Sequence, residues 1–93
     1  MRTISERKTK AVTEEGKVIF LRYCVFAKPL RSGRREVGES LGIRVEARCD
    51  GEKTVKCVDD VTTDIAFALH LQELLANMTV TPTTLLDVII DAI

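Results

Sequence analysis

The side chains best suited to catalysis or metal binding are three cysteines and one histidine, and they lie far apart in the sequence. Cys24, Cys49, Cys57 and His70 could together supply the four ligands of a tetrahedral zinc site. No C-x-x-C pair brings two of them close together, so the spacing favours three free thiols that pack as small hydrophobic residues. An odd number of cysteines is typical of a reducing compartment, which predicts a cytoplasmic protein.

Carboxylates and glycine-rich motifs add no catalytic centre. Asp59, Asp60 and Asp64 could form a metal-binding cluster, but they precede an apolar helical segment, and capping of that helix explains them more simply. His70 is expected on the polar side of the same helix. The sequence has no G-x-x-x-x-G-K-[ST], G-x-G-x-x-G or G-x-S-x-G motif. We therefore expect a protein that is not an enzyme and holds neither a metal nor a cofactor.

The basic residues with the closest spacing are Lys28, Arg31, Arg34 and Arg35. They surround Ser32-Gly33, a turn signal, and an arginine-rich hairpin tip can contact phosphates. Aromatic side chains that could stack on bases are missing from this segment, because all of them lie in apolar runs (Phe20, Tyr23, Phe26 and Phe67). The segment is therefore either a phosphate contact or a solvated hairpin tip.

Charge divides the chain into two halves. The 93 residues carry no net charge, yet all 14 Lys and Arg residues lie between Arg2 and Lys56. Residues 1–57 hold those 14 cations and eight acids, a net charge of +6, whereas residues 58–93 hold six acids and no Lys or Arg, a net charge of −6. Such asymmetry indicates association surfaces, although the two halves could also neutralise each other by packing together.

The basic half has the alternation of β-strands. Residues 17–28 are apolar on both faces, which predicts a central strand. Residues 3–13 are polar and predict either an edge strand, with a turn at residues 14–16, or a frayed terminus. Residues 29–36 predict a loop, because Pro29 cannot donate to a ladder. Residues 41–47 alternate cleanly and predict a half-buried antiparallel strand.

A hairpin follows at Asp50-Gly51. A two-residue turn would place Val45 opposite Lys56, which mixes core and solvent faces. A three-residue turn that begins at Cys49, with Gly51 at positive φ, places Val45 opposite Val55 and Ile43 opposite Cys57. Matching of the apolar faces favours the three-residue turn.

The acidic half has helical periodicity. Thr62 or Thr63 is expected to cap a leucine-rich helix that extends to Met78. A second helix is expected to start at Thr81-Pro82, with an apolar face of Leu85, Leu86, Ile89, Ile90 and Ile93.

These capping and leucine patterns carry a family resemblance. Residues 60–64, the leucine-rich helix and residues 81–91 resemble a family of short proteins that is catalogued as a domain of unknown function and associated with clostridia-like Gram-positive bacteria. The resemblance implies a cytoplasmic bacterial protein and brings no activity and no functional residues.

Together these patterns predict one α+β domain over residues 1–93. An antiparallel meander of three or four strands (1–57) is followed by two C-terminal helices (58–93) packed on one face. No apolar run reaches the ~20 residues that span a bilayer, and the N-terminus lacks the apolar segment of a secretory signal. We expect no membrane partner.

Two functions fit this architecture. The first is a protein–protein interaction or regulatory module, most simply a homodimer, with self-association through Phe20, Phe26, Leu71 and Leu74. The second is nucleic-acid binding through the basic sheet and residues 28–35.

Overall fold

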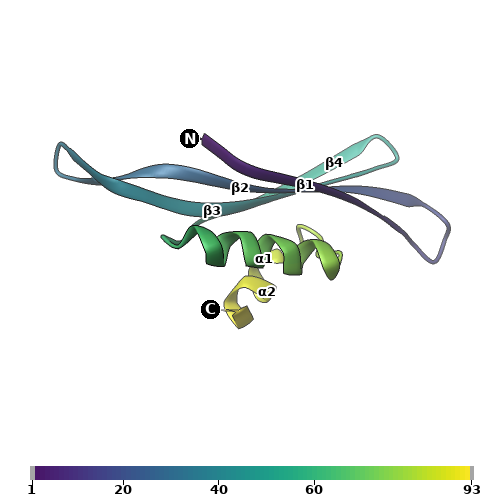
Figure 1. Cartoon of the computed structure of the whole chain (residues 1–93). Helices are drawn as coiled ribbons and strands as arrows, with labels where there is room; N and C mark the ends of the chain where they lie inside the picture. Colours follow the sequence, from purple (N-terminus) through teal and green to yellow (C-terminus); the bar gives the residue numbers. More distant parts are fainter. Residues whose placement is uncertain (1, 93) are drawn as a thin grey trace.

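A computed structural model describes residues 2–92 and shows a four-stranded antiparallel meander followed by two helices (Figure 1). The strands β1 (Arg2–Val12), β2 (Val18–Ser32), β3 (Arg35–Cys49) and β4 (Glu52–Thr62) lie side by side in chain order. The helices are α1 (Ile65–Asn77) and α2 (Leu85–Ala92). The α+β class is confirmed, and residues 2–12 form an edge strand. The sheet continues to Thr62, beyond the expected boundary at residue 57.

Both helices lie on the same side of the sheet, and α1 is the nearer one (Figure 1). α1 contacts all four strands, whereas the main contact of α2 with the sheet is to β4. The core between sheet and helices is built around Tyr23 and buried aliphatic side chains, chiefly Ile43, Val45, Leu71, Leu75, Leu85 and Ile89. The helices therefore leave the opposite face of the sheet, here called the open face, uncovered.

A buried polar network fastens the helical layer to the sheet. The Tyr23 hydroxyl donates to the carbonyl of Val80, after α1, over 2.8 Å. Gln72 of α1 donates to the Tyr23 carbonyl over 2.9 Å and accepts from the Ser5 hydroxyl over 2.9 Å. Gln72 is 4 % exposed, and these partners satisfy the polar groups that α1 brings into the core.

The expected three-residue turn between β3 and β4 is wrong. Cys49 pairs with Glu52 and Val45 with Lys56, so the turn is the two-residue Asp50-Gly51. Gly51 does have positive φ, at 80°, and Asp50 has φ 52°. Positive φ at both turn residues is the type I′ geometry, whose twist suits a two-residue hairpin.

The prediction of the turn from matching apolar faces of β3 and β4 was wrong because β4 is an edge strand with a bulge. Ile43 pairs with Val58, but Leu41 pairs with Thr62, and Asp60 in the intervening segment has φ 54°. The bulge lets both Val58 and Val61 pack against the core. Residues 52–57 of β4 are exposed, so they did not need to match the apolar face of β3.

The helix starts also differ from expectation. The N-cap of α1 is Asp64, whose carboxylate accepts from Ala66 N at 2.9 Å and Phe67 N at 3.3 Å, while Thr62 accepts from Asp64 N at 3.0 Å. α2 starts at Leu85 rather than Pro82, after a turn in which Thr84 N donates to Thr81 O. Ile93, expected on the apolar face of α2, lies outside the described residues.

Candidate functional site

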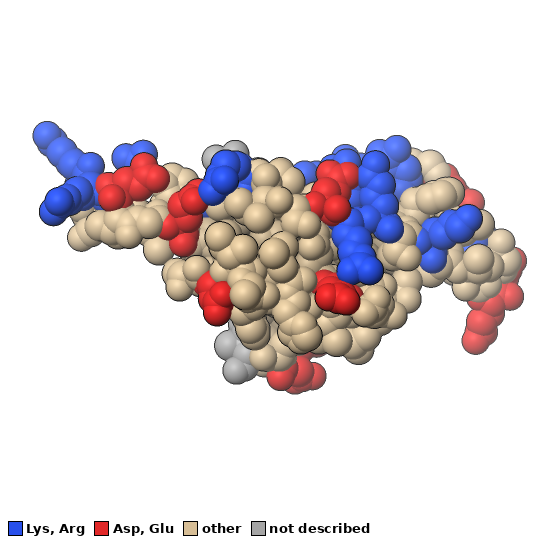
Figure 2. Space-filling model, in the orientation of Figure 1, with Lys and Arg blue, Asp and Glu red and all other residues tan. Residues whose placement is uncertain are grey.

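The open face of the sheet carries a cluster of basic side chains. Cross-strand pairing places Lys10, Phe20, Arg48 and Lys53 in one row, Lys8, Arg22, Glu46 and Val55 in the next, and Glu6, Cys24, Arg44 and Cys57 in a third. Figure 2 shows Lys and Arg gathered over the strands, with none on the helices below them. The Lys and Arg side chains of the sequence therefore all lie in the sheet layer, and the helical layer has none.

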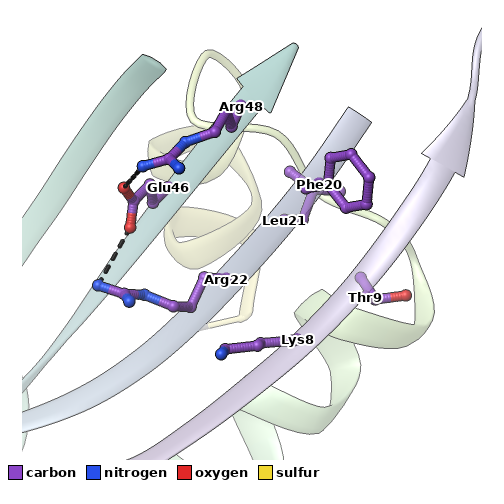
Figure 3. Close-up of a pocket in the computed structure, with 7 residues that line it drawn as sticks. All are labelled: Lys8, Thr9, Phe20, Leu21, Arg22, Glu46 and Arg48. Carbon is purple, nitrogen blue, oxygen red and sulfur yellow. Dashed lines mark ion pairs between the residues drawn. The ribbon is translucent and has the colours of Figure 1, made fainter. Parts of the chain in front are cut away.

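Phe20 is the large apolar side chain that stands out on this face, because it is 58 % exposed. It lies in a shallow depression of about 440 Å³ that Lys8, Thr9, Leu21, Arg22, Glu46 and Arg48 also line. These residues come from the three neighbouring strands β1, β2 and β3, and the helices lie behind them (Figure 3). An exposed aromatic ring thus lies between basic side chains on both of its neighbouring strands.

Glu46 organises the cations of the depression. Its carboxylate lies 2.9 Å from Lys53 Nζ, 3.1 Å from Arg22 Nη2 and 3.8 Å from Arg48 Nη2 (Figure 3). The hydrogen bond from Lys53, followed by the charge of Arg22, lowers the pKa of Glu46 despite burial, which acts in the opposite direction. The carboxylate therefore stays ionised and holds the cations in place.

Positive charge remains after this pairing. Glu6 and Lys8 are 3.6 Å apart, and Glu6 and Glu46 are the only acids in the three rows. Within residues 2–92, Lys10 and Arg44 form no ion pair. The three rows contain six Lys and Arg side chains against these two carboxylates, so the open face is suited to an anionic ligand.

The predicted basic segment is not a loop. β2 and β3 continue to a two-residue turn at Gly33-Arg34, and Pro29 pairs with Glu39. The last described β1 pair is at Ala27, so β2 has no partner on that side at Pro29, where a missing N–H costs nothing. Residues 28–40 therefore form a two-stranded arm beyond the rest of the sheet, at the left of Figure 1.

The arm carries all four predicted basic residues, in two groups. Lys28 lies at its base, 2.9 Å from Asp59, and the hydrogen bond to that carboxylate raises the pKa of Lys28. Arg31, Arg34 and Arg35 are exposed at the tip and make no ion pair within the described chain. The structure does not bring the tip and the Phe20 depression together, since the third row of the open face and the base of the arm separate them.

A family model described as a family of unknown function, DUF6514, matches residues 2–93. The chain belongs to the DUF6514 family. The match extends well beyond the C-terminal third that carried the resemblance in the sequence. No curated protein and no solved structure matches the chain.

The cysteines of this DUF6514 protein are free and differ in exposure. Cys24 is buried, Cys49 is intermediate and Cys57 is exposed on the open face, so only Cys24 has the buried environment that was expected for all three. Burial is the main cause that raises the pKa of the Cys24 thiol. His70 is exposed on α1. Within residues 2–92, no three His, Cys, Asp or Glu side chains form a group that could hold a metal.

The four residues predicted for self-association do not share one surface in the DUF6514 structure. Leu71 is 2 % exposed because it faces the sheet, and Phe26 is 3 % exposed because its ring lies over Gly42. Phe20 lies on the open face, while Leu74 is 37 % exposed on α1. The prediction of a single self-association interface that includes all four residues is therefore wrong.

Other apolar side chains are exposed on the helices. They are Ile65, Leu69, Leu74, Met78, Leu86 and Ile90, here called the exposed helical apolar residues. None of the helices in the described part of the DUF6514 chain has the length and apolar character needed to cross a bilayer.

Proposed function

We propose that this DUF6514 protein is a non-catalytic nucleic-acid-binding protein that uses the open face of its sheet and the basic arm. The observation that carries the proposal is the exposed Phe20 ring between basic residues of neighbouring strands. Nucleic-acid-binding surfaces combine cations for phosphates with aromatic rings for bases. The sequence showed the cations but placed every aromatic in an apolar run, whereas the fold puts Phe20 beside Lys8, Arg22 and Arg48.

A binding role fits the chemistry of the site better than catalysis. Glu46 is the carboxylate of the depression, and its lowered pKa and its cation partners make it a poor general acid or base near neutral pH. The remaining charged groups there are the cations Lys8, Arg22 and Arg48, whose side chains are suited to binding anions.

Charge reversal on the open face tests this function. We expect Lys10→Glu with Arg48→Glu to weaken binding of labelled nucleic acid at least about tenfold at ~50 mM salt, because two phosphate contacts become repulsive. Fluorescence anisotropy with single- and double-stranded DNA and RNA measures the affinity, and log K should fall linearly with log salt concentration. Arg31, Arg34 and Arg35 changed together to Glu should also weaken binding, because the basic arm is part of the proposed surface.

Lys56→Glu is the matched control for the open face. Lys56 is an exposed cation of β4, but its pairing with Val45 places it on the helix side of the sheet. The control should leave the affinity within about twofold of the native value, since Lys56 faces the helices and salt screens charges at a distance from the ligand. Absence of binding to all four nucleic acids at low salt would rule the function out.

The exposed helical apolar residues favour self-association as a second function. Leu86 and Ile90 are 45 % and 61 % exposed and lie four positions apart, on one face of α2. The helical segment has no Lys or Arg, so a two-fold contact there meets no basic side chains. A homodimer would remove this apolar surface from water.

Sedimentation at micromolar concentration tests the dimer. We expect about twice the chain mass for the native protein and a monomer for Leu86→Asp with Ile90→Asp. Val37→Asp is the control, because Val37 is 60 % exposed but lies on the arm. A native protein that sediments as a monomer would contradict the dimer and leave nucleic-acid binding unaffected.

A further inference from the structure

The Phe20 ring has the surroundings of a stacking platform. Its row neighbours on the open face are Lys10 of β1 and Arg48 of β3. Two residues further along β2, on the same face, lies Arg22, whose β1 partner is Lys8. Cations therefore lie beside the ring on both neighbouring strands and along its own strand, while the ring itself is 58 % exposed.

Two of the cations around the ring, Arg22 and Arg48, are each held in place by an ion pair. Glu46 contacts Arg22 and Arg48, and its side chain is only 9 % exposed. The side chain of Arg22 is 38 % exposed, so it lies partly along the sheet surface instead of extending into water. A ligand at Phe20 would meet guanidinium groups that are already oriented, which reduces the entropy lost on binding.

This geometry favours an unpaired base over a base pair. A stacking contact needs the flat face of a base, and in a duplex those faces are covered by the neighbouring base pairs. The ring lies in a shallow depression of a sheet face, not on a projecting helix or ribbon that could enter a groove. Single strands can turn a base outward onto an aromatic ring while phosphates remain on nearby cations.

We propose that the depression around Phe20 binds one unpaired base of a single-stranded nucleic acid, by stacking on the ring, with the adjoining phosphates on Lys8, Lys10 and Arg48. This inference rests on the proposed nucleic-acid function and specifies its ligand. Glu46 is then a positioning residue, because it acts through Arg22 and Arg48 and does not touch the nucleic acid.

Substitution of the ring tests the platform. For a labelled 20-nucleotide single strand of thymidines, Phe20→Leu should lower the affinity about 5- to 150-fold, which corresponds to the ~1–3 kcal/mol of one base–aromatic stack. The slope of log K against log salt should not change, because the substitution removes no phosphate contact. Phe20→Trp should retain the affinity, and the duplex of the same length should bind more weakly than the single strand.

Val55→Ala is the matched control, since Val55 is an exposed apolar residue of the same face, 40 % exposed, outside the lining of the depression. It should leave the affinity unchanged. Urea unfolding of Phe20→Leu should match that of the native protein, because an exposed ring contributes little to the core.

The outcomes distinguish failure of the Phe20 stacking site from failure of nucleic-acid binding as a whole. Equal or tighter binding of duplex, or no effect of Phe20→Leu, would overturn the stacking site while nucleic-acid binding stands. Thymidine monophosphate that competes as strongly as the 20-nucleotide strand would assign the depression to free nucleotides and also overturn it. Loss of binding to every nucleic acid would remove both proposals.

Discussion

Replacement of Gly42 by alanine is expected to destabilise the fold by about 2–3 kcal/mol. A Cβ atom at Gly42 would lie 2.4 Å from Cζ of Phe26, 2.7 Å from its Cε2 and 2.7 Å from the Val58 carbonyl oxygen. Phe26 is the cross-strand partner of Gly42, and its ring covers the glycine. Either the buried ring or the β4 backbone must move to admit one methyl group. Urea unfolding followed by circular dichroism measures the loss.

A double-mutant cycle identifies the cause of that loss. Phe26→Leu in the Gly42→Ala background removes the two ring contacts but leaves the contact with the Val58 carbonyl. The double variant should therefore lose less stability than the sum of the two single variants. Native-like stability of Gly42→Ala would mean that the ring does not lie over β3 as described.

Alkaline pH is expected to destabilise the protein by about 2–3 kcal/mol through Tyr23 alone. Burial raises the pKa of Tyr23 from 10.0 to about 12. The folded state therefore retains the phenol proton to higher pH than the unfolded state. The stabilising contribution is complete below pH 10 and is lost as the pH rises from 10 to 12. Unfolding free energies measured across this range report the change.

Tyr23→Phe is the control for this titration. At neutral pH it should cost about 1–2 kcal/mol, because the Val80 carbonyl loses its donor. The stability difference between native protein and variant should then shrink above pH 10. Tyr23 is the single tyrosine of the chain, so phenolate absorbance follows its ionisation directly. An ordinary pKa near 10, or an unchanged difference at high pH, would contradict the burial of the Tyr23 phenol.

Local sequence patterns were sufficient for several elements of this fold. The alternation of residues 41–47, the Asp50-Gly51 turn signal and the helical period after Asp60 each reflect interactions between near neighbours, and all correspond to elements of the structure. The division of charge at residue 57 also follows from the sequence alone. These features depend on side-chain period and backbone preference, which are local properties.

Local patterns were misleading where a strand has solvent on one side. The rule that apolar residues of paired strands share one face favoured the wrong turn before β4. This rule applies only where a strand must fit a buried face. Pro29 indicated a loop, but a proline is tolerated in β2 where β1 no longer pairs with it. The N-cap was assigned to Thr62 or Thr63, although Asp64 caps the helix with a stronger, charged acceptor.

The candidate site itself was decided by the tertiary structure. The sequence determined that basic residues and aromatic residues occur in the first half of the chain, but Lys8, Phe20 and Arg48 are far apart along it. They meet because antiparallel pairing places Phe20 opposite Lys10 and Arg48, and because both helices pack on the other face. Register and the choice of covered face depend on the sum of many long-range contacts. For this reason Phe20, which the sequence analysis assigned to an apolar self-association surface, lies in solvent among cations.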